Sequence, residues 1–280
     1  MAKKWTAIIE PPKRTANLRL NEVWQYRDLI LLFVKRDFTT RYKQTILGPL
    51  WFLIQPLFIT ITQTFVFGNI AKLSTDGLPQ VLFYMAGNVF WLYFSTCLTS
   101  TSNTFTANAK LFGKIYFPRL TTPISTAISS LINFGIQFVM FLCFTVFFII
   151  QGANVHINWI AALTPLIVLQ LAILGTGCGI IISALTTKYR DLQVMVSFGV
   201  MIWMYLSPVI ISGSSLSEPI YKLMMLNPVS PAIELMRYGW LGSGTTPFIY
   251  WIISFAVSVA LFLLGTILFN RVEKTFMDTV

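Results

Sequence analysis

The chain alternates between long apolar stretches and short clusters of charged residues. Five long windows contain no Asp, Glu, Lys or Arg, and a spanning helix needs about 20 mostly apolar residues. The window 120–187 is long enough for two spans, which we expect to divide near residues 151–154. The pattern therefore predicts six spanning helices, near residues 48–70, 80–101, 123–150, 159–185, 192–211 and 247–269.

Composition places these helices in a lipid bilayer. Hydrophobic residues make up 55% of the 280 residues and charged residues 11%, whereas soluble domains carry about 25% charged residues. A bilayer admits only helices and closed barrels, and the windows are too long and too continuously apolar for barrel strands. We therefore expect an all-α integral membrane protein.

The placement of basic residues predicts how the chain sits in the membrane. Of the 20 Lys and Arg residues, 17 precede the first span or fall in alternate segments after it. Lys and Arg concentrate on the cytoplasmic side, so both termini are expected there. Because the excess follows topology, we expect no nucleic-acid partner. The chain then divides into a cytoplasmic arm (1–46), a six-helix membrane domain (47–270) and a cytoplasmic tail (271–280).

The arm contains a segment of mixed character. Across residues 20–42 apolar side chains recur at helical spacing between charged ones, which predicts a basic amphipathic helix lying in the membrane interface. Such a helix either anchors the arm to the membrane surface or docks a soluble partner, and both roles can hold. The apolar positions are Leu20, Val23, Trp24, Leu31, Val34 and Phe38.

One face of the first span mixes aromatic rings with polar groups. At 100° per residue, Trp51, Gln55, Phe58, Thr62 and Phe65 lie in one narrow stripe. Polar side chains in a span often hydrogen-bond a neighbouring helix. Alternatively, the stripe lines a conduit for sugars, which stack on aromatic rings and bond to amides. Both interpretations stay open on this pattern alone.

Small residues mark the fourth span. Gly175, Gly177 and Gly179 permit close contact between helices. Residues two positions apart do not share one face of a helix. The glycines are therefore a weak indication of a single packing surface.

The cytoplasmic segment 108–119 carries more apolar residues than a connector needs. It mixes cations with aromatic residues and stops at Pro118. This pattern predicts a short amphipathic helix that proline ends.

The segment 212–246 is equally apolar for an external loop. It places Ser or Asn ahead of Pro within 217–219 and again within 227–231, and proline in the first turn is typical of helix starts. We expect two short re-entrant helices on the periplasmic side, which form either a lid over an exit or a surface cap. Glu234 and Arg237, three residues apart, are expected to pair.

Several activities lack the residues that they need. No stretch matches Gly-x4-Gly-Lys-Ser/Thr, so no ATP or Mg²⁺ site is expected in this chain. The single histidine, His156, stands without a metal cluster or a nucleophile–base pair, and we expect neither a catalytic residue nor a metal site. The expected spans hold no charged residue, although ion-coupled carriers usually keep one. A transported solute would therefore need a separate motor.

Four motifs resemble, in the same order, those of the ABC-2 type permeases. The motifs are RYKQTILGPLW at 41–51, FGKIYFPR at 112–119, KYRD at 188–191, and LNPVSP at 226–231 followed by Arg237-Tyr-Gly. The match covers nearly the whole chain. Within the family the chain is most similar to the branch that exports lipid-linked polysaccharides, which are O-antigen of lipopolysaccharide, capsule and teichoic acid.

The resemblance implies a partner set and a location. We expect a homodimer in the bacterial inner membrane, with two ABC ATPase subunits on the cytoplasmic side that bind the ATP and Mg²⁺. The cargo would be a polyprenyl-pyrophosphate-linked glycan, most of all O-antigen, moving between the protomers along the first and fifth spans. Relatives also move drugs and lipids, so a small-molecule exporter is the alternative. A membrane scaffold that transports nothing is a third possibility.

Helical phase and the resemblance together assign roles at the channel and its entrance. Glycan contact is expected from the first-span stripe, Trp51, Gln55, Phe58, Thr62 and Phe65, and from Trp203 and Tyr205 of the fifth span. Basic residues of the arm would attract the phosphates of the lipid carrier. These are Arg36, Arg41 and Lys43.

The resemblance also implies a coupling helix and a periplasmic gate. The residues expected to contact the ATPase are Lys110, Leu111, Phe112, Lys114, Tyr116 and Arg119. The residues expected in the gate are Glu218, Tyr221, Met225, Pro228, Glu234 and Arg237.

Overall fold

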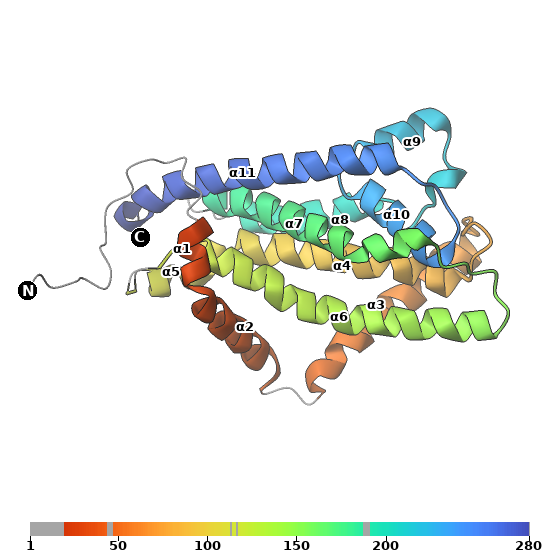
Figure 1. Cartoon of the computed structure of the whole chain (residues 1–280), viewed down its shortest axis with the longest axis horizontal. Helices are drawn as coiled ribbons and strands as arrows, with labels where there is room; N and C mark the ends of the chain where they lie inside the picture. Colours follow the sequence, from red (N-terminus) through yellow and green to blue (C-terminus); the bar gives the residue numbers. More distant parts are fainter. Residues whose placement is uncertain (1–19, 44–46, 113, 116, 187–190, 280) are drawn as a thin grey trace, which may run out of the picture.

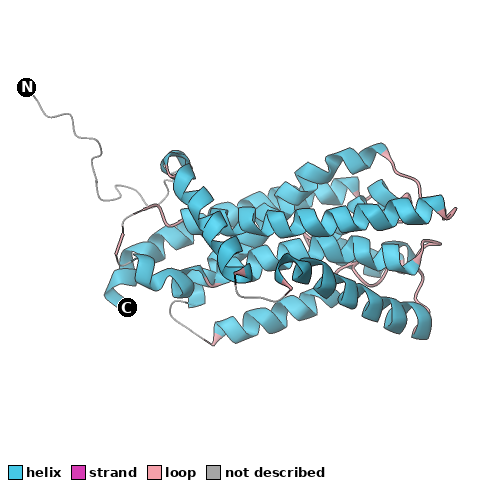
Figure 2. Ribbon diagram, turned by 90° about the horizontal axis from the view of Figure 1, so that it is seen from below, coloured by secondary structure: helices cyan, strands magenta, loops and turns pink. Residues whose placement is uncertain are grey.

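The computed structural model describes residues 20–43, 47–112, 114–115, 117–186 and 191–279, and every regular element among them is helical. The long helices lie side by side in one bundle (Figures 1 and 2). They are α3 (Trp51–Gln63) with the π-helical η2 (Thr64–Ile70), α4 (Gln80–Ser102), α6 (Thr121–Ile150), α7 (Thr164–Thr186), α8 (Leu192–Tyr205) and α11 (Phe248–Thr279).

The remaining helices lie at the two ends of this bundle (Figure 1). At the end where α11 finishes lie α1 (Leu20–Gln25), α2 (Arg27–Tyr42) and α5 (Thr104–Phe112). At the opposite end lie α9 (Glu218–Met225) and α10 (Ser230–Leu241). Three short 3-10 helices are η1 (Gly48–Leu50), η3 (Trp159–Leu163) and η4 (Gly213–Ser215).

Within the described residues, five helices are long and apolar enough to cross a membrane, and they match five of the six expected spans. They are Trp51–Ile70, Gln80–Ser102, Thr121–Ile150, Trp159–Thr186 and Phe248–Phe269. The remaining expected span, 192–211, is wrong at its end, because α8 stops at Tyr205. Its 14 residues measure about 21 Å at 1.5 Å per residue, less than the ~30 Å of a bilayer core. The sixth crossing stays a prediction.

The α7 helix lies between α4 and α11 at the centre of the bundle (Figure 1). A Cβ atom on Gly175 or Gly179 would lie 2.8 Å from a backbone oxygen of α4, and one on Gly177 would lie 2.8 Å from Phe262 of α11. Gly175 and Gly179 therefore face α4, and Gly177 faces α11 on the opposite side of α7. Absent side chains let both backbones approach α7 closely.

The N-terminal segment is helical as expected, and its place in the membrane interface stays a prediction. The helix breaks at Tyr26, and α2 lies against α6 with Ile30 and Phe33 buried. Of the apolar positions that predicted this helix, Val23 and Val34 are buried and Trp24 and Leu31 are exposed. The apolar residues of this segment surround the helix, so their spacing alone did not identify one face.

The two apolar loops contain helices near the expected places. The helix α5 ends at Phe112, well before Pro118, so the expectation that proline ends it is wrong. Both α9 and α10 begin with proline in the first turn, as predicted. At the other terminus α11 continues through the expected tail to Thr279.

Candidate functional site

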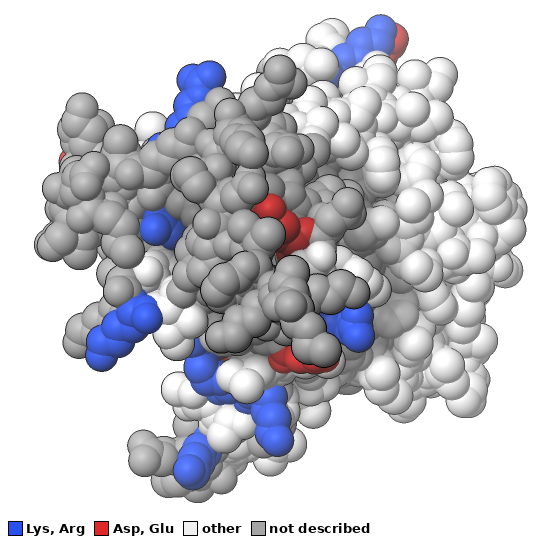
Figure 3. Space-filling model, turned by 60° about the vertical axis from the view of Figure 1, so that its left-hand side comes forward, with Lys and Arg blue, Asp and Glu red and all other residues white. Residues whose placement is uncertain are grey.

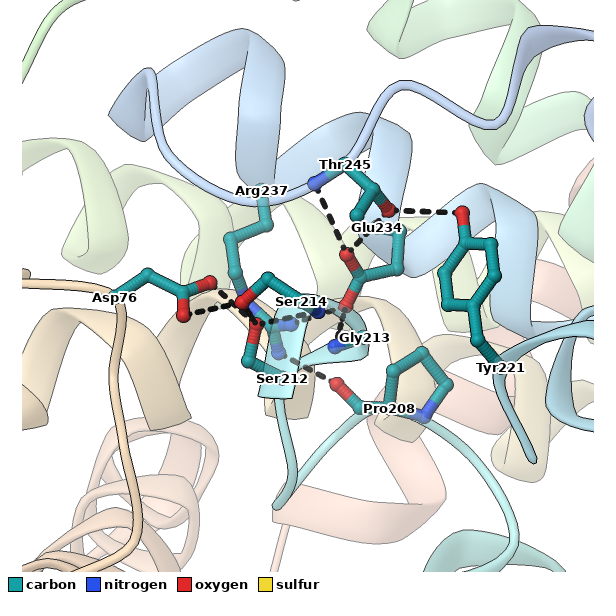
Figure 4. A network of polar contacts seen from close by, with 9 residues as sticks. All are labelled: Asp76, Pro208, Ser212, Gly213, Ser214, Tyr221, Glu234, Arg237 and Thr245. Atoms are coloured by element: carbon teal, nitrogen blue, oxygen red, sulfur yellow. Dashed lines mark hydrogen bonds and ion pairs between the residues drawn. The ribbon is translucent and has the colours of Figure 1, made fainter. Parts of the chain in front are cut away.

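A buried ion pair lies at the end of the bundle where α9 and α10 are found (Figure 4). Arg237 Nη1 lies 2.8 Å from Glu234 Oε1, and neither side chain is exposed. The predicted pairing of these two residues is confirmed. Arg237 Nη2 also donates to the Pro208 carbonyl at 2.6 Å, and the guanidinium carbon lies 3.9 Å from the centroid of the Phe83 ring. A buried pair is stable only when further bonds of this kind satisfy its remaining atoms.

The other oxygen of the Glu234 carboxylate is held from a different loop. It accepts hydrogen bonds from the Thr245 hydroxyl at 3.0 Å and from the Thr245 amide at 3.4 Å. The Gly213 amide donates to Oε1 at 3.2 Å. The Tyr221 hydroxyl donates to Thr245 Oγ1 at 3.1 Å, and burial raises the pKa of Tyr221 above its ordinary value. Glu234 thus joins three segments that are distant in sequence.

Asp76 extends this cluster toward the loop that follows η2. The hydroxyls of Ser212 and Ser214 both donate to its carboxylate, Ser214 at 2.5 Å. The Ser243 hydroxyl donates to the Asp76 backbone carbonyl at 2.8 Å. We call the following residues the outer cluster: Asp76, Ser212, Ser214, Tyr221, Glu234, Arg237 and Thr245 (Figure 4).

The sequence indicated only part of the outer cluster. Asp76, Ser212, Ser214 and Thr245 were not expected there. Asp76 is the one acidic residue between the first two spans, and this isolation was the available signal. Which partner it meets is decided by tertiary packing, which spacing does not show.

The other gate candidates lie apart from the outer cluster. Glu218 is exposed and bonds to Lys222 at 2.6 Å, and this bond holds the pKa of Glu218 below its ordinary value. Met225 is buried. The Pro228 carbonyl accepts a hydrogen bond from Ser254. Of the six expected gate residues, the structure therefore brings Tyr221, Glu234 and Arg237 together.

The end of α8 is tied to the same region. The last carbonyls of a helix have no partner within the helix. Here Asn227 Nδ2 donates to the Leu206 carbonyl at 3.2 Å, and Trp203 Nε1 donates to Asn227 Oδ1 at 2.8 Å. The Trp203 ring packs edge-on against Phe94 at 5.1 Å. Trp203 is therefore half-buried, with its ring directed toward Phe94 and its Nε1 toward Asn227.

The aromatic stripe of α3 and η2 faces outward. Trp51, Phe58 and Phe65 are 48%, 67% and 59% exposed, and Thr62 is also exposed. Gln55 lines a cavity of about 130 Å³ between α3, α4 and α6. No residue of the stripe hydrogen-bonds a neighbouring helix within the described part of the chain.

The bonds to α4 come from the opposite face of α3. Asn88 Nδ2 donates to Gln63 Oε1 at 2.7 Å and to Thr60 Oγ1 at 3.2 Å. Interhelical hydrogen bonding therefore explains why Thr60 and Gln63 are polar, but it does not explain the polar residues of the stripe. A helix that faced only lipid would have no need of Gln55 and Thr62.

The α8 helix presents a second open face. None of its 14 residues is buried. Tyr205 is exposed and borders a largely apolar cavity of about 390 Å³ between the end of α8 and α9, with Ile220 and Met224 in its wall. Of the expected fifth-span contacts, Tyr205 is exposed and Trp203 is half-buried.

The coupling candidates divide into buried and exposed residues. Phe112 is buried against Phe105 and Phe117, and the Arg119 guanidinium carbon lies 5.3 Å from the Phe112 centroid. Leu111 is half-buried and Lys114 is exposed. The Lys110 side chain and Tyr116 lie outside the described residues.

Basic side chains gather at the end of the molecule where α2 and α5 lie (Figure 3). Arg36 Nη2 lies 2.8 Å from Asp37 Oδ1, so its charge is balanced locally. Lys43 is exposed, and the Arg41 side chain lies outside the described part. The neighbouring flank in Figure 3 shows almost no charge, as a membrane domain requires.

Comparison with known proteins identifies the family. The family described as ABC-2 type transporter matches residues 28–241. The chain belongs to the ABC-2 type transporter family. As a member it is a multi-pass membrane protein with a transport role, and membership implies an ABC ATPase partner in general. The matched region includes α3, α8, α10 and the arm helix α2.

Three curated relatives match this ABC-2 type protein over most of its length. Two are named O-antigen export system permease protein RfbA, from Klebsiella pneumoniae, with 27% and 26% identity over 90% of this chain and 94% of the relative. A third of the same name, from Myxococcus xanthus, is 25% identical over 78% of this chain and 80% of the relative. All three are named as permeases, in keeping with a membrane subunit that is not an enzyme.

Proposed function

We propose that this chain is the channel-forming subunit of an ATP-driven exporter that moves polyprenyl-pyrophosphate-linked polysaccharide, most of all O-antigen, across the bacterial inner membrane. The observation that carries the proposal is the match to O-antigen export permeases over 90% of the chain. The outward aromatic stripe of α3 supports a sugar cargo, because rings bind pyranose faces without demanding one sequence.

The open faces of α3 and α8 support a dimeric channel. Two copies that met along these faces would enclose Trp51, Phe58 and Phe65 and remove them from lipid. Each aromatic contact is weak, so a long polymer can slide from ring to ring. The outer cluster would hold the exit end, where α9 and α10 lie.

The entrance and the motor belong to the opposite end. Lys43 and the neighbouring basic residues of α2 would attract the lipid phosphates near the cytoplasmic surface. Two ABC ATPase subunits would bind ATP and Mg²⁺ and press on the segment after α5. Lys114 is exposed enough to touch them. The buried Phe112 and Arg119 would position that contact instead of making it.

Depletion of the protein in a strain that makes surface polysaccharide tests the proposal. Glycan is then located by specific lectin or antibody in intact and in permeabilised cells. We expect polymer trapped inside on its lipid carrier. Unchanged surface polysaccharide would contradict the proposal and favour export of a small molecule, drug or lipid. A chain that binds no ATPase would instead indicate a scaffold.

A further inference from the structure

A polar tract runs inside the protomer between α4 and α6, away from the open face of α8. One cavity of about 260 Å³ is bounded by α2, α4, α5 and α6, and the cavity of about 130 Å³ that Gln55 lines is bounded by α3, α4 and α6. Ser130 and Asn133 line both, so the two cavities adjoin. We call the α6 side of this tract the polar seam, formed by Thr126, Ser129, Ser130, Asn133 and Gln137.

Part of the polar seam has unused hydrogen-bonding capacity. Thr126 and Ser130 donate to carbonyls of their own helix at 3.0 and 2.8 Å, as hydroxyls in helices commonly do. The Ser129 hydroxyl is buried and has no hydrogen-bond partner among the residues that the structure describes. Neither carboxamide, Asn133 or Gln137, bonds another residue in the described ranges, although Gln137 is only 8% exposed.

Such unpaired groups are costly in a membrane domain. The buried Ser129 hydroxyl costs about 1–3 kcal/mol. The two carboxamides are open to the cavities, where lipid would supply no replacement partner. Both carboxamides line cavities, so a ligand that enters them can reach these donors and acceptors. The polar seam is therefore suited to a molecule rich in hydrogen-bonding groups.

The charges and rings of the tract narrow the class of ligand. Arg36 lines the larger cavity, but its Nε and Nη2 both bond to Asp37 Oδ1, at 2.9 and 2.8 Å, so that cavity holds no uncompensated cation among its described lining residues. Tyr93 and Phe134 line the smaller cavity with ring centroids 5.2 Å apart. Neutral hydrogen-bonding groups, a balanced ion pair and aromatic rings suit a pyranose better than a bare phosphate, which favours free cations.

The geometry points to a sugar-binding site inside each protomer, and we propose that the polar seam holds a sugar near the lipid-linked end of the glycan. This inference rests on the proposed function. Arg36 also borders the outer groove of α2 that contains Lys35 and Lys43. The pyrophosphate would lie on that basic groove, and the adjoining sugar would lie in the seam.

Binding measurements on two variants test this assignment. The full-length chain in lipid nanodiscs is titrated with the lipid-linked glycan extracted from cells depleted of the protein. We expect Asn133→Leu and Gln137→Met each to weaken binding about threefold to tenfold, the loss of one hydrogen bond. Their melting temperatures should hold or rise, because an unpaired amide has been removed. Gln151→Met is the matched control, since Gln151 is exposed at the end of the same helix and should bind normally.

A second probe, polyprenyl pyrophosphate without sugar, separates the outcomes. Its binding should be the same in the unaltered chain and in both variants. Equal weakening of the sugar-free lipid would overturn the sugar assignment in favour of a phosphate-headed lipid. Unchanged glycan binding in both variants would overturn the site while leaving the proposed function standing. An unaltered chain that bound neither probe would remove both proposals.

Discussion

The centre and the edge of this bundle are packed in opposite ways. Buried residues make up 78% of the most apolar stretch of α4 but 22% of that of α3 with η2, and α8 has none. Where α7 meets α4 and α11, glycines bring backbones into contact. The α4 and α7 helices, whose apolar stretches are 78% and 61% buried, form the packed centre of the protomer. The α3 and α8 helices lie at the edge and leave most of their side chains at least partly exposed in the protomer.

Substitution in the buried Glu234–Arg237 pair is expected to lower the stability of the protein more than any other change. Arg237→Met would leave the Glu234 carboxylate buried without its cation and the Pro208 carbonyl without its donor. Breaking a buried pair costs about 3–5 kcal/mol. We expect a large fall in melting temperature, measured by thermal unfolding in detergent. The double variant Glu234→Gln/Arg237→Met should recover part of the loss. A double variant as unstable as the single one would show that the charge is not the cause.

Substitution of one glycine in the centre of the bundle and one at its edge by alanine compares how tightly the two regions are packed. A Cβ on Gly179 would lie 2.6 Å from the Thr101 Cβ, whereas one on Gly199 of α8 meets nothing within 4 Å. We expect Gly179→Ala to cost about 1–3 kcal/mol by forcing α4 and α7 apart. Gly199→Ala should be neutral or stabilising by up to about 1 kcal/mol. Equal effects on the melting temperature would show that α8 is packed by something not seen in one protomer.

Removing rings from the open face should affect export and not folding. Trp51→Ala and Phe58→Ala are expected to lower surface polysaccharide about threefold to tenfold at unchanged melting temperature and ATPase assembly, because each ring is exposed in the protomer. Phe147→Ala, an exposed ring on α6, is the matched control. Normal export in both stripe variants, measured by surface labelling, would remove the stripe from the channel.

The smallest effect is expected on α9. The pKa of Glu218 is lowered and that of Lys222 is raised by their mutual bond. A lowered carboxyl pKa stabilises the folded protein fully at pH values above the ordinary pKa of the carboxyl group. This stability is lost as the pH falls through the lowered pKa. The raised lysine pKa adds stability that is lost only at strongly alkaline pH. Because the pair is exposed, Glu218→Gln should leave export and melting at pH 7 unchanged. A loss of export would show that Glu218 touches a partner or the cargo.

The sequence predicted the spans Gln80–Ser102, Thr121–Ile150 and Trp159–Thr186 to within two residues at each end. Their apolar windows are bounded by charged or turn-forming residues, so composition alone limits them. The end of α8 was wrong because Val209 and Ile210 continue the apolar run while buried in protein and not in lipid. Hydropathy does not distinguish these two environments.

The candidate sites were predictable where partners are local and not where they are distant. Glu234 and Arg237 lie three residues apart, so helical spacing sufficed to pair them. The bonds from Ser212 and Ser214 to Asp76 join segments more than 130 residues apart. The inward direction of Trp203 likewise depends on Asn227, which spacing does not place.

The π-helical turn after α3 has a consequence for length variation among related chains. A π-helix accommodates one more residue in a turn than an α-helix does. Loss of a single residue within Thr64–Ile70 would let this stretch become α-helical and leave both flanks nearly in place. The same loss in the middle of α4 would rotate every later side chain by about 100°. Deletions should therefore be tolerated in η2 and eliminated from α4, which a library of single-codon deletions under selection for export would reveal.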